Sequence, residues 1–218
     1  MFFSEKTQLN KILPKAKFMK LAELSTPIRA EIQNNVERII LANILRQETI
    51  NISAGENVKE IDLFEFLLKE KQISNNLIKE IDSAIPKHIV FVFRFKDLVQ
   101  LAVSYKEKTS VENRYKVVKT YRSEWQKVEN ANLELNGLNL DSVFTNFINQ
   151  IANGKIETDG SKDIKQAVED SLAKEKLERK ITQLKSKIRK ECQFNKQLEL
   201  KKELKELERK LETSKFVS

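Results

Sequence analysis

The stretch that most constrains the fold spans residues 89–106, where two apolar runs flank a short polar turn. Residues 89–93 are all β-branched or aromatic without a helical period, and a second run resumes after Lys96 and Asp97. This pattern predicts a β-hairpin. Because the first run is apolar on both faces, we expect helices to cover the sheet on both sides.

The segments around the hairpin predict further helices and strands. Ser25 and Pro27 form a helix-start signal, and apolar residues at helical spacing follow, so we expect one long core helix to about residue 46. Ser74 and Asp141 are expected to cap two more helices. Further strands are expected over residues 49–52, 58–68 and 115–125.

These segments predict an α+β fold in which a mixed or mainly antiparallel sheet is covered by helices. We expect a globular domain over residues 1–152, followed by a linker over 153–163 that contains two of the four glycines. A long helical arm is expected over residues 164–213, because this part has no proline or glycine and is dominated by Lys, Glu and Leu. Residues 214–218 form a short tail.

Two apolar stripes run along the predicted arm, each with 4-3-4 spacing. The first consists of Leu177, Ile181, Leu184 and Ile188, and the second of Leu200, Leu204, Leu207 and Leu211. On a straight helix they lie nearly opposite each other, because residues 188 and 204 are about 4.4 turns apart. We expect a continuous or gently kinked helix rather than a hairpin bent back near residues 193–195. One intramolecular partner cannot bury both stripes, so we predict that they and Phe194 dock protein partners.

The charge of the chain is concentrated in the arm. The formal net charge is +8, and residues 162–218 hold 17 Lys and Arg against 11 Asp and Glu, which leaves 23 against 21 for the rest. A basic segment favours acidic partners. Lys185, Lys187, Arg189 and Lys190 could follow a phosphate backbone, although glutamates interleaved with lysines also occur on the solvated face of a coiled coil.

Residue types that carry catalysis are scarce. His88 is the sole histidine, and the four glycines do not have the spacing of a phosphate-binding loop. We therefore predict no catalytic residue, no cofactor and no metal site. One remote alternative remains, a metal-dependent nuclease, whose carboxylates and lysine lie on adjacent strands. The candidates are Asp62, Glu65, Asp97 and Lys106. Ser104 stands where a second carboxylate is needed, so such a site would be eroded.

Two further features bear on the cellular compartment. Cys192 is the single cysteine, which excludes an intramolecular disulfide and any zinc site built on cysteine pairs. The chain has no apolar run of signal length and no 18 consecutive apolar residues. We therefore expect a cytoplasmic protein without a membrane partner.

Several stretches resemble a bacterial family classified only as a domain of unknown function, number four-three-nine-one. The matching stretches are residues 13–15 with Phe18, residues 48–52, residues 84–86, residues 123–125 and residues 190–200. The resemblance runs over nearly the full length, although Cys192 stands where members usually carry a basic residue. It implies genes that neighbour a DNA methyltransferase and a superfamily-two helicase in restriction-like or antiphage loci.

The arm and the resemblance together lead to one functional expectation and one alternative. We expect a non-catalytic subunit or adaptor of a restriction-like or antiphage defence complex, whose arm docks on a helicase or DNA methyltransferase. Self-association through the arm is the nearest variant. The alternative is a nucleic-acid-binding accessory protein that uses the basic arm to contact DNA.

Overall fold

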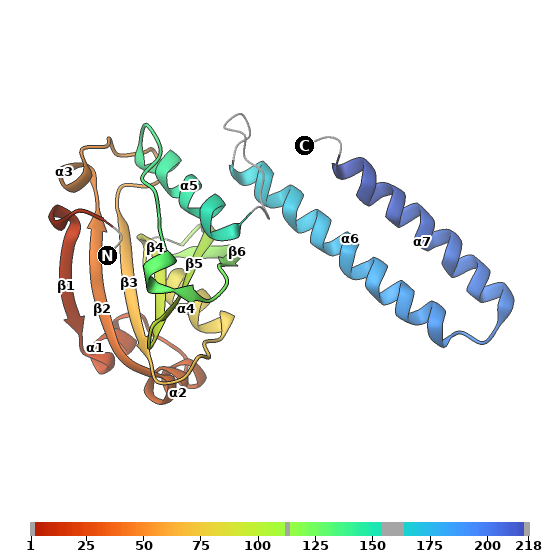
Figure 1. Cartoon of the computed structure of the whole chain (residues 1–218), viewed down its shortest axis with the longest axis horizontal. Coiled ribbons are helices and arrows are strands. Elements are labelled where there is room, and N and C mark those ends of the chain that lie inside the picture. Colours follow the sequence, from red (N-terminus) through yellow and green to blue (C-terminus); the bar gives the residue numbers. More distant parts are fainter. Residues whose placement is uncertain (1–2, 112–113, 154–163, 216–218) are drawn as a thin grey trace. The chain divides into compact units, whose positions relative to one another are not determined.

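The computed structural model describes residues 3–111, 114–153 and 164–215 (Figure 1). The chain divides into two compact units, Met1–Gly154 and Lys155–Ser218. The first unit is α+β and the second consists of helices. Residues 154–163 of the predicted linker and residues 216–218 of the predicted tail lie outside the described residues. No helix in the described parts of the chain is both long and apolar enough to cross a membrane.

A mixed seven-stranded sheet forms the centre of the first unit. Its strands are β1 (Gln8–Leu13), β2 (Val36–Leu45), β3 (Ile61–Leu68), β4 (His88–Phe95), β5 (Leu98–Lys108), β6 (Tyr115–Arg122) and β7 (Gln126–Lys127). The order is β1-β2-β3-β4-β5-β6, and β7 also pairs with β5. β3 and β4 are parallel, and the other pairs are antiparallel. The expected mixed sheet is therefore confirmed.

The predicted hairpin is confirmed as β4 and β5. Phe95 pairs with Leu98, and Lys96 in the turn has a φ of 55°, in the left-handed region that tight hairpin turns require. The side chains of β4 are buried from His88 to Phe93. Both faces of this strand are therefore covered, as its uninterrupted apolar run predicts.

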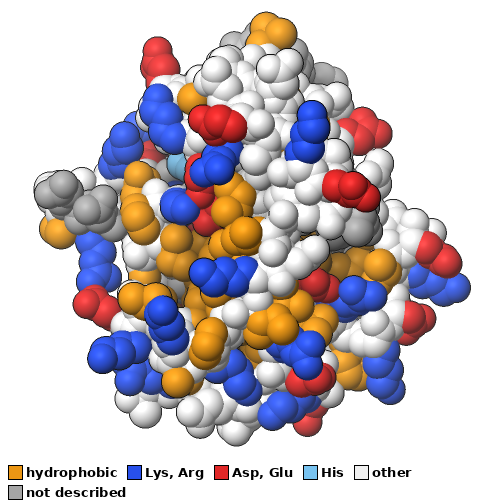
Figure 2. Space-filling model, turned by 90° about the vertical axis from the view of Figure 1, so that its left-hand side faces the viewer, with side chains coloured by type: hydrophobic (Ala, Val, Ile, Leu, Met, Phe, Trp, Pro, Cys, Tyr) orange, Lys and Arg blue, Asp and Glu red, His pale blue; other side chains and the backbone are white. Residues whose placement is uncertain are grey.

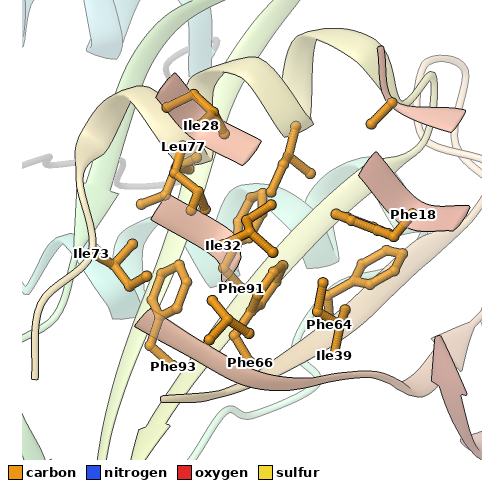
Figure 3. Packing of buried hydrophobic residues seen from close by; sticks show 14 of the residues in the cluster. Phe18, Ile28, Ile32, Ile39, Phe64, Phe66, Ile73, Leu77, Phe91 and Phe93 are labelled. Carbon is orange, nitrogen blue, oxygen red and sulfur yellow. The ribbon is translucent and has the colours of Figure 1, made fainter. Parts of the chain in front are cut away.

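Helices cover the two faces of the sheet separately. The helices of this unit are α1 (Lys15–Leu21), α2 (Thr26–Asn35), α3 (Gln47–Ile50), α4 (Asn75–Ala84) and α5 (Leu140–Ala152). Residues of α1, α2 and α4 pack on Phe64, Phe66 and Phe91 in one buried cluster (Figure 3). On the other face, the Phe144 ring of α5 lies 4.6 Å from the His88 ring between centroids.

The long core helix predicted up to residue 46 is wrong, because α2 ends at Asn35 and the chain continues as strand β2. Bulges shift the register of β2, so Val36, Ile39 and Asn43 are buried at a helix-like spacing although the backbone is extended. Ser25 precedes α2, but its hydroxyl donates to the Glu80 carboxylate, 2.7 Å away, instead of capping. The strand predicted over residues 49–52 is also wrong, because α3 occupies part of it.

Ser74 caps α4 as predicted, and its hydroxyl accepts the Leu77 N–H at 3.1 Å. Asp141 does not cap α5. Asn139 caps it instead, accepting the Ser142 N–H at 2.9 Å. The Asp141 carboxylate accepts the N–H groups of residues 56–58 at 2.6 to 3.1 Å and thereby holds the loop before β3 against α5.

β1 lies at one edge of the sheet, and its outer side has no strand neighbour among the described residues. Figure 2 shows this side of the first unit, where hydrophobic side chains gather among Lys and Arg. Leu9 and Ile12 are 48% and 56% exposed. A register shift between Gln8 and Lys11, together with the lysine itself, discourages the addition of another strand to this edge.

The second unit is a helical hairpin, so the expected continuous helix is wrong. It consists of α6 (Ile164–Lys190) and α7 (Phe194–Lys215), which lie side by side (Figure 1). Three residues, 191–193, connect them without proline or glycine. At this end the Gln197 amide donates to the Ile188 carbonyl at 3.2 Å. The two stripes are out of phase because they belong to two helices that pack on each other.

Candidate functional site

Two groups of polar residues are candidate functional sites, because core packing alone explains neither. One lies in the sheet unit, where α4 ends and β3 and β4 begin. The other lies at the end of the helical hairpin where α6 leads into α7. The first group is largely buried and the second is largely exposed.

Lys106 of β5 is buried, and its ammonium group is fully surrounded by acceptors. It lies 2.7 Å from the Asp82 carboxylate and donates to the carbonyls of Asp82, Ile85 and Lys87 at 2.9, 3.0 and 2.6 Å. The ring of Tyr115 lies 4.9 Å from the same nitrogen. Burial raises the pKa of Asp82, and Lys106 opposes this shift. Lys106 therefore binds the carbonyl-rich C-terminal end of α4 and fixes its connection to β4.

Asp62 of β3 lies beside Glu60 and Lys87. Its Oδ2 is 3.7 Å from the Lys87 ammonium, which also pairs with Glu60. Burial raises the pKa of Asp62 to about 7; Lys87 opposes this shift and Glu60 reinforces it. Asp62 Oδ1 has no hydrogen-bond partner among the residues that the structure describes. The carboxyl is thus held between its protonated and ionised forms near neutral pH.

His88 begins β4 and is 8% exposed. Its ring meets the ring of Phe144 edge to face, and Tyr115 lies 6.4 Å away between ring centroids. Burial and the nearby charge of Lys106 lower the pKa of His88 to about 4. The imidazole is therefore neutral at physiological pH and packs as an aromatic residue at the start of the strand.

The four residues that suggested an eroded nuclease do not come together. Glu65 pairs with Arg94 at 3.2 Å, and Asp97 lies in the turn between β4 and β5. Asp62 and Lys106 approach the same end of the sheet, but Lys106 is bound to Asp82. Within residues 3–111, 114–153 and 164–215, no group of three or more His, Cys, Asp or Glu could hold a metal ion.

The sequence interpretation overlooked Asp82, although the sequence contains a signal for it. Asp82 follows the buried Ile81 on the apolar face of α4, where Ile78 lies one turn earlier. A carboxylate on such a face needs a buried cation. Lys106 lies near the end of a largely buried strand and is the matching signal.

In the hairpin, the structure brings the two predicted docking stripes together. Ile181 and Leu184 are 7% exposed. The remaining stripe residues are half-buried: Leu177, Ile188, Leu200, Leu204, Leu207 and Leu211. The predicted docking residue Phe194 differs, because it is 73% exposed. Leu198, one turn further along α7, is 47% exposed.

The basic residues gather at the same end of the hairpin. We define the hairpin tip as residues 183–202, which hold seven Lys and Arg against two Glu, whereas the rest of residues 164–215 holds nine against eight. Lys187, Arg189 and Lys190, the residues predicted to contact phosphates, are exposed. Lys185 is less available, because it pairs with Glu208 at 2.8 Å.

Comparison with known proteins gives a family but no characterised relative. No curated protein matches the chain, and no solved structure matches it. One family model matches residues 3–211, and its description is Domain of unknown function (DUF4391). The match includes the sheet unit and nearly all of the helical hairpin. The chain therefore belongs to the DUF4391 family.

Proposed function

We propose that the protein is a non-catalytic accessory subunit that docks on a partner protein through the tip of its helical hairpin. The observation that carries this proposal is the exposure of Phe194 and Leu198, at 73% and 47%. They are four residues apart on α7 and so share one face of the helix. Aromatic residues, including Phe, are enriched at the centres of protein contacts, and exposed apolar residues that lie side by side mark interaction sites.

The internal packing of the hairpin narrows the docking surface to this tip. Each stripe is covered at least in part by the other helix, so the stripes do not require an outside partner. In the sheet unit, the buried Lys106 is engaged with Asp82. A binding role therefore fits the exposed residues better than a catalytic role fits the buried ones.

The partner we propose is the DNA methyltransferase or the helicase of a restriction-like or antiphage locus. The sequence resemblance implies this gene neighbourhood. In an assembly with such an enzyme, the role we propose for this protein is a contact with the enzyme rather than a reaction of its own. A helical hairpin with an exposed apolar tip supplies such a contact.

A co-purification experiment tests the proposal. Full-length protein is mixed with the methyltransferase and the helicase encoded beside its gene, and recovery is compared with that of a Phe194→Ser, Leu198→Ser variant. We expect recovery to fall at least about tenfold, because truncating central contact residues costs about 1–2 kcal/mol each. Leu138→Ser is the matched control, since Leu138 is 93% exposed but lies in the sheet unit.

Circular dichroism checks that the double variant keeps its helices. Equal recovery of both partners by the wild type and the double variant would contradict the proposal. Light scattering that shows a dimer dissociated by the same substitutions would point instead to a second copy of this chain as the occupant of the tip.

A further inference from the structure

We propose that the cations of the hairpin tip form a binding surface for the backbone of duplex DNA. This goes beyond partner docking, because it uses the lysines and arginine of the tip rather than Phe194 and Leu198. The surface comprises Lys187, Arg189 and Lys190 of α6 and Lys196, Lys201 and Lys202 of α7, all of which are exposed.

The charge of this surface is not neutralised within the hairpin. Among the residues that the structure describes, none of these six cations forms an ion pair. Lys196, for example, has Cys192 and Leu200 four residues away, and neither offers a carboxylate. In the rest of the hairpin, by contrast, acidic and basic residues are nearly balanced.

The arrangement of the cations favours a polyanion over an acidic protein surface. At about 100° per residue, Lys187 and Lys190 lie only about 60° apart around α6, whereas Arg189 lies about 100° or more from either. A flat acidic patch on a protein could therefore not meet all three side chains equally well. Duplex DNA carries about one negative charge per 1.7 Å and presents phosphates on both sides of each groove, so it can meet cations on several sides of a narrow tip.

Backbone contacts of this kind predict binding without sequence preference and with a strong dependence on salt. Each phosphate contact contributes about 0.9 to the slope of log affinity against log salt. Losing four cations should therefore lower that slope by up to roughly 3.5. It should also weaken binding at least about tenfold at low salt.

Fluorescence anisotropy with the full-length protein and two unrelated labelled duplexes tests this inference. The tip variant carries Lys187→Gln, Arg189→Gln, Lys190→Gln and Lys196→Gln. The control variant carries Lys6→Gln, Lys11→Gln, Lys17→Gln and Lys20→Gln, four exposed lysines of the sheet unit, and so has the same net charge. We expect the tip variant to lose binding and salt dependence, and the control to bind both duplexes like the wild type.

Four results would overturn the inference. The first is a wild type that fails to bind the duplex at low salt, and the second is equal weakening of binding by both variants. The third is a single-stranded oligonucleotide of the same length that binds more tightly than the duplex. The fourth is a tip variant that loses the protein partner while the wild type binds no DNA, which would make the ligand an acidic protein surface. The Phe194→Ser, Leu198→Ser variant separates the two proposals, because it should keep DNA binding even if it loses its protein partner.

Discussion

Lys106–Asp82 in the sheet unit and Lys185–Glu208 in the helical hairpin are ion pairs of almost equal length, 2.7 Å and 2.8 Å between nitrogen and oxygen. Their surroundings differ completely. The side chains of the first pair are 0% and 1% exposed, and those of the second are 50% and 42% exposed. Distance alone therefore says little about what each pair does for the protein.

The difference follows from the cost of removing charges from water. In the sheet unit, neither Lys106 nor Asp82 can be left alone, because an unpaired buried charge costs several kcal/mol. In the hairpin, water solvates either partner after the other is lost, so the pair contributes little. The buried pair of the sheet unit thus fixes one structure, whereas the charges of the pair in the helical hairpin stay exposed to water.

Of the substitutions proposed, Lys106→Met should have the largest effect on the stability of the protein. It leaves the Asp82 carboxylate buried without its cation, and we expect the free energy of unfolding to fall by about 3–5 kcal/mol. Urea unfolding followed by the fluorescence of Trp125 measures this directly, because this tryptophan is the only one in the chain and packs against the core of the sheet unit.

Two further variants show whether the loss comes from the unpaired carboxylate. Lys17→Met removes an exposed lysine from the same unit and should change stability by less than about 0.5 kcal/mol. Combining Lys106→Met with Asp82→Leu removes both charges and should recover much of the lost stability. If the double variant loses as much unfolding free energy as the two single variants together, Lys106 and Asp82 contribute through their packing rather than through their charges.

A pH titration sharpens the comparison within the sheet unit. The folded state raises the pKa of Asp62 to about 7, so its carboxyl keeps a proton that the unfolded chain releases, and stability falls as pH rises from about 4 to 7. The folded state lowers the pKa of His88 to about 4, so stability from this residue rises between about pH 4 and 6.5. The two effects are opposite in sign and overlap.

Single substitutions should therefore reveal opposite slopes of unfolding free energy against pH. Relative to the wild type, Asp62→Asn should make stability rise more steeply from about pH 4.5 to 6.5, and His88→Phe should make it fall, each by up to about 1.4 kcal/mol per pH unit. Urea unfolding at several pH values measures both slopes. Shifts of the same sign in the two variants would mean that these residues do not titrate as the structure implies.

How far the sequence predicted this structure depended on whether local and tertiary signals agreed. The hairpin of β4 and β5 was predictable because its side chains are suited to a strand on both faces. β2 was not, because Val36, Ile40 and Ile44 recur every four residues, as on the apolar face of a helix. Only pairing with strands distant in sequence makes it extended.

The helical hairpin shows a different limit of prediction from the sequence. No proline or glycine marks the reversal at residues 191–193, so local propensity favours one helix. The out-of-phase stripes were the correct signal, because two stripes that cannot share one partner can cover each other after a reversal. At the candidate site, Phe194 was predicted, whereas the gathering of lysines from both helices at the tip depends on the fold.

The smallest expected effect concerns the exposed pair Lys185–Glu208. A double-mutant cycle with Lys185→Met and Glu208→Gln should give a coupling of only about 0.2–1 kcal/mol, at most about a third of the loss expected for Lys106→Met, because both side chains are near half exposure. Helix unfolding followed by circular dichroism measures this coupling, and raising the salt concentration should reduce it further. A coupling above about 2 kcal/mol that resists salt would mean that the tip is less solvated than its exposure indicates, and its cations would then be poorer contacts for DNA.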